Sequence, residues 1–241
     1  MQELKDTQSE ADTRNISIDR VGVKGLRFPI QIQDKLNRIQ STVATVSLAV
    51  DLPEEFKGTH MSRFVEALHQ HGPLLDVHTA LSIPRELLGR LSASRSHVEM
   101  EFPFFRAKAA PVTGRESLMD YVVRFEMEAE AGDRLADFKL TVVVPVTTLC
   151  PCSKAMSSYG AHNQRGIVTY SVRFASRPVW IEDLIDLVES CASCSLFRVL
   201  KKPDEKRMPE KDYETPGLVE DLVRTVTPLR IQLVPGGSGK L

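Results

Sequence analysis

The sequence lacks several features that would point directly to a function. Its charge is balanced, with 31 Lys and Arg against 32 Asp and Glu and a formal net charge of -1, so no global excess favours nucleic acid or an anionic membrane. No apolar run is long enough to span a bilayer, and residues 1–15 have no apolar signal core. A Gly-rich phosphate loop of the Walker or dinucleotide type is also missing. We therefore expect a cytoplasmic protein whose basic groups act locally.

Cysteine is scarce, and the 4 cysteines stand as two close pairs, Cys150 with Cys152 and Cys191 with Cys194. In a reducing cytoplasm such pairs are more typical of metal ligands, catalytic thiols or core residues than of disulfides. The pairs therefore indicate chemistry or packing rather than covalent cross-links.

The hydropathy pattern predicts a mixture of strands and helices. Alternating or continuous apolar runs predict strands over residues 21–32, 41–52, 98–110, 118–131, 135–146, 167–174 and 229–234. Helical spacing predicts one helix from His60, one within 76–91 that is interrupted or begins near Pro84, one opening at 178–183 and one over 214–226. Residues 201–206 are charged and contain a proline, which predicts a loop.

The order of these elements predicts an α+β fold. It runs strand, strand, helix, helix, strand, strand, then begins again and stops after one closing strand. This order indicates two modules that share an antiparallel sheet with helices on one face. We expect a flexible tail at 1–15, a first module at 16–131, a second module at 132–235 that carries the Cys/His site, and a flexible tail at 236–241. The second module is one strand short, so its edge should be covered by something else unless the chain is truncated or changed in frame.

The connection between the strands at 135–146 and 167–174 is the part richest in reactive groups. Thiolate and imidazole are ligands that zinc and similar ions prefer, and they also serve as a nucleophile and its base. We interpret Cys150 as a metal-bound or reactive thiolate, with a small buried strand-end residue as the alternative. His162 is interpreted as a ligand or a general acid–base rather than a solvated loop residue. For Cys152 the same arguments carry less weight.

A different use of the cysteines is a four-thiolate structural zinc site built from both pairs. Against it, Cys191 and Cys194 fall in the expected amphipathic helix rather than in a tight knuckle. Packing in the core is therefore the better interpretation of the second pair.

Other charged groups are ambiguous on their own. Glu205, Glu214 and Glu220 have a solvated surface as their default role. The lysines around Glu205 indicate either a phosphate-facing loop or a soluble turn. Residues 60–63, His-Met-Ser-Arg, could meet an anion at the positive end of a helix or form an ordinary helix cap.

Two motifs taken together resemble the signature of the type IB GTP cyclohydrolases. They are Leu-Cys-Pro-Cys-Ser-Lys at 149–154 and Tyr-Gly-Ala-His-Asn-Gln-Arg at 159–165. Further segments that match this family lie at 21–27, 58–64, 202–206 and 219–222. The resemblance covers roughly residues 15–227, and the first motif is highly specific.

This resemblance implies a tunnelling fold and a particular reaction. The family is a homotetramer with active sites at subunit interfaces. It hydrolyses GTP to 7,8-dihydroneopterin triphosphate and formate, the first step towards tetrahydrofolate and queuosine-type tRNA bases. The resemblance also implies a divalent metal, zinc, manganese or iron, whose bound water attacks C8 of the purine, and no organic cofactor.

Site residues follow from the same resemblance. Cys150 and His162 would be catalytic, and Cys150, His162 and Glu205 would approach the metal. Glu220 is the first choice for binding guanine N1–H and its exocyclic amine, with Glu205 as the second. The basic groups that would meet the triphosphate are Arg63, Lys154 and Arg165.

One departure from the family pattern concerns the metal site. The family closes with a Glu-x-x-His segment that supplies a carboxylate and a histidine, and the residues after Val226 have no counterpart. Loss of ligands weakens metal binding, so we expect this chain to be impaired or inactive. The alternatives are then a pterin- or nucleotide-binding homologue without full activity, or a zinc-stabilised structural protein.

Overall fold

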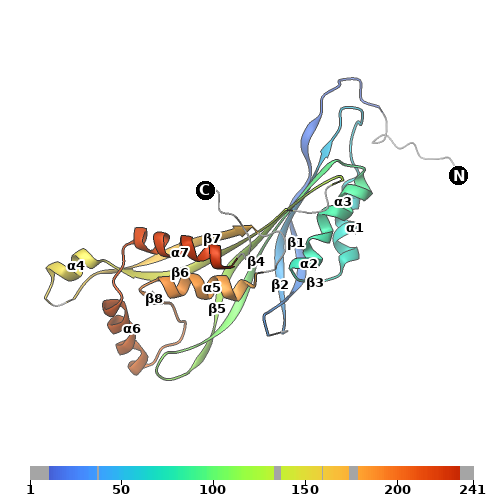
Figure 1. The fold of residues 1–241 in the computed structure, drawn as a ribbon. Helices are drawn as coiled ribbons and strands as arrows, with labels where there is room; N and C mark the ends of the chain where they lie inside the picture. The colour runs from blue at the N-terminus through green and yellow to red at the C-terminus, as the bar shows by residue number, and fades with distance from the viewer. Residues whose placement is uncertain (1–10, 37, 133–136, 159, 174–178, 234–241) are drawn as a thin grey trace. The chain divides into compact units, whose positions relative to one another are not determined.

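The fold was analysed in a computed structural model that describes residues 11–36, 38–132, 137–158, 160–173 and 179–233 (Figure 1). The elements are β1 (Ile18–Gln33), β2 (Ile39–Leu52), α1 (Met61–His71), β3 (Leu74–Leu75), α2 (Val77–Ala80), α3 (Ser82–Leu91), β4 (Arg95–Ala109), β5 (Glu116–Glu130), β6 (Asp137–Leu149), α4 (Pro151–Met156), β7 (Asn163–Arg173), α5 (Ile181–Cys191), β8 (Cys194–Ser195), α6 (Lys202–Glu214) and α7 (Val219–Leu233). The expected tails at 1–15 and 236–241 fall outside the described residues, apart from 11–15. None of the helices in the described part of the chain combines the length and apolar character of a membrane span.

The strands confirm the expected α+β class with a mostly antiparallel sheet. Across the described residues their order is β3-β1-β2-β4-β5-β6-β7, and β8 pairs with β6. The pairs β1–β2, β2–β4 and β6–β8 are antiparallel, whereas the two-residue β3 lies parallel to β1. The described residues fall into two compact units. The first takes those within Met1–Phe102, Arg124–Leu140 and Arg173–Pro178, and the second those within Pro103–Val123, Thr141–Val172 and Val179–Leu241.

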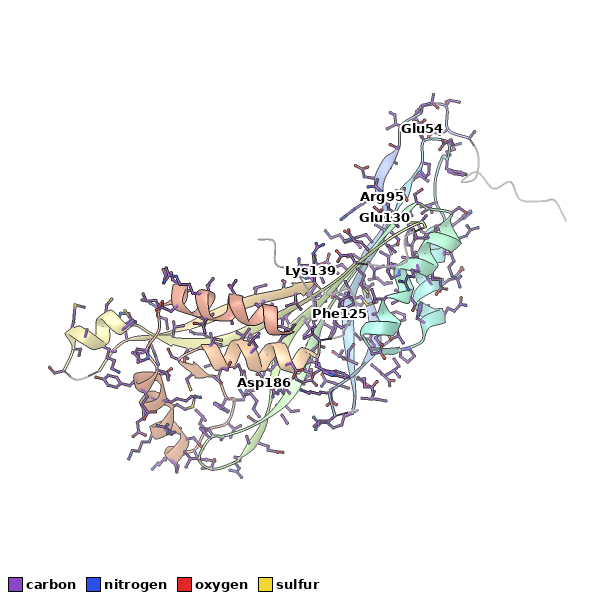
Figure 2. All side chains as sticks on the ribbon, viewed as in Figure 1. Glu54, Arg95, Phe125, Glu130, Lys139 and Asp186 are labelled. Atoms are coloured by element: carbon purple, nitrogen blue, oxygen red, sulfur yellow. The ribbon has the colours of Figure 1, made fainter. Side chains whose placement is uncertain are left out.

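The first unit is built on long alternating strands that bury one face. On β5 the predicted apolar face is confirmed, because Phe125 and Met127 are buried whereas Glu128 is exposed. Phe125 packs edge-on against Phe102, with ring centroids 5.1 Å apart, and its position in the sheet is shown in Figure 2. Two helices, α1 and α3, pack against each other beside β1 and β2 (Figure 1). Apolar burial therefore explains both the strand pattern and the helix positions.

Glycine explains part of the motif at 21–27. A Cβ atom on Gly22 would lie 1.9 Å from the Leu48 carbonyl oxygen, so only glycine allows β1 to approach β2 this closely. Gly25 has a φ of 75°, and the register between the strands shifts between Val23 and Leu26. Two glycines thus permit an irregular, tightly paired stretch of β1.

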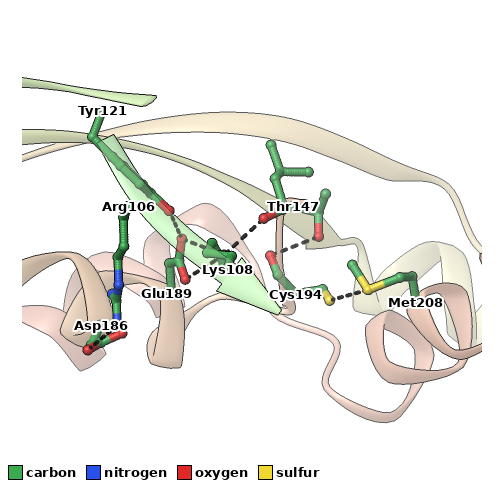
Figure 3. Close-up of polar contacts among 9 residues, drawn as sticks. Arg106, Lys108, Tyr121, Thr147, Asp186, Glu189, Cys194 and Met208 are labelled. Carbon is green, nitrogen blue, oxygen red and sulfur yellow. Dashed lines mark hydrogen bonds and ion pairs between the residues drawn. The ribbon is translucent and has the colours of Figure 1, made fainter. Parts of the chain in front are cut away.

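In the second unit, α5 covers strand residues through its predicted apolar stripe. Ile181, Leu184, Ile185 and Val188 are buried, which confirms the amphipathic pattern. The polar face of the same helix reaches β4 and β5 (Figure 3). Lys108 Nζ donates to both Glu189 carboxylate oxygens at 2.9 and 2.8 Å, and Tyr121 donates its hydroxyl to Glu189 Oε1 at 2.8 Å. Both apolar burial and these hydrogen bonds therefore hold α5 against β4 and β5.

Two expectations about the second unit were wrong, and a third element begins at a different residue. Residues 201–206 are not a loop, because α6 begins at Lys202 with Pro203 in its first turn, where a missing N–H costs no helical hydrogen bond. Residues 229–233 continue α7 and form no strand, since a short apolar alternation does not separate strand from helix. The helix expected over 214–226 is confirmed from Val219, where α7 begins, whereas Glu214 is the last residue of α6.

Other boundaries differ less. The helix expected within 76–91 is two helices, and Pro84 lies in the first turn of α3, the second of them. The short helix α4 follows Cys150 and was not predicted. Cys194 lies on β8 rather than on the amphipathic helix. The proposed module boundaries at 131 and 235 stay predictions.

Candidate active site

The ends of β6 and β7 bring the predicted thiol and imidazole together. β6 ends at Leu149, Cys150 follows in extended backbone, and Pro151 starts α4. The Cys150 N–H donates to the His162 carbonyl oxygen at 3.3 Å, and β7 begins at the next residue, Asn163. The two backbones therefore lie side by side although a helix and a turn separate them in the sequence.

The short helix α4 fixes this arrangement further. The His162 N–H donates to Ser153 Oγ at 3.1 Å, and the Lys154 N–H donates to the Cys150 carbonyl oxygen at 3.1 Å. Cys150 is half-buried and His162 is exposed. Among the residues the structure describes, neither side chain forms a hydrogen bond or ion pair. A half-buried thiol and an exposed imidazole therefore stand on hydrogen-bonded backbones at these strand ends.

The basic side chains of the motif have different surroundings. Lys154 Nζ donates to the Tyr213 carbonyl oxygen at 2.5 Å and lies 4.1 Å from the centroid of the Tyr213 ring. This contact joins α4 to the end of α6. Arg165 is exposed on β7, two residues beyond Asn163. Tyr159 of the motif lies outside the described residues.

The predicted carboxylates lie at the beginnings of two helices. Glu205 is exposed in the first turn of α6, and its N–H donates to the Lys201 carbonyl oxygen at 2.9 Å. Glu220 is exposed in the first turn of α7. Acidic residues in the first turn complement the positive end of a helix, so both positions also have a structural explanation.

Arg63 belongs to the first unit, near the start of α1. Its Nη1 donates to the Arg90 carbonyl oxygen at 2.9 Å. With His60, Gly58 and Thr59 it lines a pocket of about 120 Å³. His60 is the N-cap residue of α1 but forms no side-chain cap hydrogen bond, so it is not an ordinary cap. A second hollow of about 120 Å³ in this unit is lined by charged residues that include Arg95 and Glu130 (Figure 2).

The possible metal donors of the site are a thiol, an imidazole and a carboxylate. Cys150 and His162 are a thiol and an imidazole on neighbouring backbones, which are donors that zinc accepts. Within the described residues, however, no group of three or more His, Cys, Asp or Glu side chains is arranged to hold a metal ion. In the described part of a single chain two of the expected donors therefore lie on hydrogen-bonded backbones, and they form no group of three with Glu205.

The second cysteine pair has packing roles. Cys194 is buried, its Sγ lies 3.6 Å from Met208 Sδ, and burial raises the pKa of its thiol. Cys191 is half-buried and lines a pocket of about 400 Å³ together with Thr148 and Leu222. Nothing in the described residues gathers the four thiols into one site.

Sequence reasoning missed two buried aspartates on α6. Asp204 is fully buried and accepts hydrogen bonds from the backbones of Val112, Thr113 and Lys201 and from the Thr113 hydroxyl. Burial alone would raise the pKa of Asp204, but these hydrogen bonds outweigh it and lower the pKa well below its usual range. A proline followed by an acidic residue is typical of a helix start and could have revealed Asp204. No sequence signal marks the other residue, Asp212.

Comparison with known proteins connects this geometry to a family. The family described as type I GTP cyclohydrolase folE2 matches residues 4–231. GTP cyclohydrolase FolE2 of Akkermansia muciniphila is 90% identical over 226 residues, which are 94% of this chain and 86% of that protein. The proteins of the same name from Nitrosomonas eutropha and Magnetococcus marinus are 51% and 50% identical, over 93% and 92% of this chain and 84% and 82% of their own lengths. The chain therefore belongs to the type I GTP cyclohydrolase folE2 family.

Proposed function

We propose that this protein is a GTP cyclohydrolase that opens the imidazole ring of GTP to give 7,8-dihydroneopterin triphosphate and formate. The observation that carries this proposal is the placement of Cys150 beside His162 at the ends of β6 and β7. Relatives named GTP cyclohydrolase FolE2, alike over more than nine-tenths of this chain, support the same reaction.

The chemistry demands two water molecules in succession and several proton transfers. The first water adds to C8 and breaks its bond to one ring nitrogen to leave a formamide, and the second releases C8 as formate, so that N7 becomes an amino group and N9 gains one proton. The ribose carbons then close the new ring with loss of one water. An imidazole can both accept and donate a proton, and the His162 side chain is exposed, which suits it for this transfer. The Cys150 thiol lies beside it as a ligand or as the critical thiol of the site.

A divalent metal, zinc, manganese or iron, is part of the proposal. When bound, such an ion lowers the pKa of water and stabilises the charge that develops on the oxygen attached to C8. Cys150 and His162 would hold it, and Glu205 is the third residue that we propose. The support is the donor chemistry of the first two residues and their shared location.

Substrate binding is assigned to exposed charged groups. Glu220 would accept hydrogen bonds from guanine N1–H and its amino group, with Glu205 as the alternative. Arg165 would meet the triphosphate from β7, and Lys154 would do so only by leaving the Tyr213 carbonyl oxygen. Arg63 would contribute from the pocket at the start of α1.

The finer features of the family are also proposals for this chain. They are the two-module tunnelling fold, a homotetramer with active sites at subunit interfaces, a cytoplasmic location and a role in folate biosynthesis. The α+β class and the antiparallel sheet support the first. An interface site would also explain why the described part of one chain forms no group of three or more metal donors.

The test is production of formate and dihydroneopterin triphosphate from GTP by the purified protein with added manganese or zinc. We expect metal-dependent product, which would contradict the impairment expected from the absence of a Glu-x-x-His segment, and a loss of about 10²- to 10⁴-fold in kcat for His162→Ala. The absence of both products with manganese, zinc and iron would overturn the proposal. Binding of GTP without turnover would instead favour the nucleotide-binding homologue.

A further inference from the structure

Asp212 is a buried acidic side chain that touches both strands of the candidate site. It lies near the end of α6 and is only 3% exposed. The Thr147 hydroxyl of β6 donates to Asp212 Oδ1 at 2.7 Å, and Asn163 Nδ2 of β7 donates to Asp212 Oδ2 at 3.0 Å. One carboxylate therefore ties together α6, β6 and β7.

The two residues that donate to Asp212 are close in sequence to the reactive residues. Thr147 lies three positions before Cys150, and Asn163 follows His162 directly. Displacing either strand end would therefore alter the place where the Cys150 N–H meets the His162 carbonyl oxygen. Small displacements of reacting groups have large effects on rate, because catalysis depends on their alignment.

The chemistry of the carboxylate sets the orientation of its partners. An ionised carboxylate only accepts hydrogen bonds, so the Asn163 amide must turn its NH₂ group towards Asp212. The Thr147 hydroxyl also lies 3.1 Å from the Cys194 carbonyl oxygen, and the shorter contact is the one to Asp212. Both carboxylate oxygens are thus used in one fixed arrangement.

The neighbouring residue strengthens this link. Lys154 of α4 donates to the Tyr213 carbonyl oxygen and covers the Tyr213 ring. The last turn of α6 therefore receives a contact from the helix that follows Cys150 as well as from the strands on either side.

We propose that Asp212 is a positioning residue of the cyclohydrolase reaction, which holds Cys150 and His162 in register through Thr147 and Asn163. This inference rests on the proposed function. It assigns no contact between Asp212 and the substrate, so its effect should appear in kcat while KM for GTP stays near the wild-type value.

The first comparison is between Asp212→Ala and Asp212→Asn. Alanine removes both acceptors, and we expect kcat to fall by about 10- to 100-fold, as when an outer partner of a site is removed. Asparagine keeps an oxygen for Asn163 and offers its NH₂ to the Thr147 oxygen, while the Thr147 proton moves to the Cys194 carbonyl oxygen. We therefore expect Asp212→Asn to retain most of the activity.

A matched control lies on the same strand. Thr141 of β6 bonds to Ser171 of β7 at 2.8 Å, hydroxyl to hydroxyl, away from the reactive residues. Thr147→Val and Thr141→Val make the same chemical change: the first removes the hydroxyl that contacts Asp212 and the Cys194 carbonyl oxygen, and the second removes the hydroxyl that bonds to Ser171. We expect Thr147→Val to lower kcat and Thr141→Val to leave it unchanged.

Amide hydrogen exchange at Cys150 gives a reading that does not depend on turnover. We expect the Cys150 amide to exchange faster in Asp212→Ala and in Thr147→Val, but not in Thr141→Val. The comparison is made after correction for any difference in the free energy of global unfolding among the variants. Wild-type exchange and wild-type kcat in these two variants would overturn the proposal.

If Asp212→Ala does not fold, Thr147→Val and Asp212→Asn decide the outcome. If the wild-type protein does not turn over GTP, the proposed function fails, and Cys150 exchange alone still tests the positioning role.

Discussion

Two regions of the second unit use polar side chains in opposite ways. Where α5 meets β4 and β5, Lys108 and Glu189 have side chains that are only 9% exposed and bond to each other. At the ends of β6 and β7, Cys150 is half-buried and His162 is exposed. A buried pair with satisfied partners holds the fold, whereas accessible reactive groups are placed for a ligand.

The local electrostatics express the same difference. Burial lowers the pKa of Lys108, while the hydrogen bond that Lys108 donates to Glu189 opposes that shift. Burial and the neighbouring Glu189 raise the pKa of Tyr121. These groups are perturbed because they are packed, so a strong pKa shift in this chain does not mark the reactive centre.

The largest effect is expected on kcat, when Cys150 at the ends of β6 and β7 is replaced. Cys150→Ala should lower kcat for GTP by about 10⁴-fold or more, the size seen when one essential group is removed from a set that acts as a unit. Thermal stability should stay close to wild type, because the thiol is only half-buried. Cys152→Ala, on exposed α4, is the control and should retain activity. Equal losses in both variants would remove the distinction between the two thiols.

The buried pair should respond in stability instead. Glu189→Ala leaves the Lys108 ammonium with one acceptor, the Leu196 carbonyl oxygen at 2.9 Å. We expect a loss of about 3–5 kcal/mol in the free energy of unfolding, measured by urea denaturation. The double variant Lys108→Met with Glu189→Leu should recover most of it, since an apolar pair needs no charge partner. No recovery would contradict a charge-based explanation.

Acid should weaken the attachment made by Asp204. Its folded-state pKa lies below the ordinary value of 3.8, so the unfolded chain takes up a proton first as the pH falls. The stability contributed by Asp204 is therefore complete above about pH 5 and is lost as the pH falls towards its lowered pKa. Denaturation curves at several pH values should show a smaller acid-dependent loss in Asp204→Asn. An unchanged pH slope would contradict this role.

The smallest effect is expected for an exposed ion pair on the same helix as Glu189. Arg106 bonds to Asp186 at 2.5 and 2.9 Å, but the Asp186 side chain is 57% exposed. Asp186→Asn should cost less than about 1 kcal/mol and less still at high salt. A cost as large as that of Glu189→Ala would show that exposure does not separate the two pairs.

Apolar periodicity made much of the fold predictable. The strand expected at 41–52, the alternation of β5 and the amphipathic pattern of α5 were confirmed, because burial on one face produces regular apolar spacing in the sequence. On β2 only one face is buried, whereas residues 41–52 were interpreted as largely buried on both. The charged segment at 201–206 was misassigned, since Lys, Asp and Glu suit both a loop and a helix start. The decisive fact is that Asp204 bonds to a distant hairpin, which local pattern does not contain.

For the site, the residues between β6 and β7 could be singled out because one connection carries a thiol and an imidazole together. The sequence could not reveal Asp212, since a lone aspartate among lysines and glutamates looks like a solvated residue. Its burial depends on Thr147 and Asn163, which lie 65 and 49 positions away. Lys154 was assigned to the triphosphate, whereas its contact with Tyr213 depends on where α6 ends.

The Asp204 contact also has a consequence for how the chain folds. Its partners at Val112 and Thr113 lie 92 and 91 positions earlier, so the contact closes a very long loop. Such closure is entropically costly and becomes favourable only after the β4–β5 hairpin and α6 have formed. During synthesis, the N–H groups of Val112 and Thr113 therefore form these hydrogen bonds only after α6, which carries Asp204, has been made. We expect docking of α6 to be a late folding step, with unfolding rather than refolding accelerated when Asp204 is replaced.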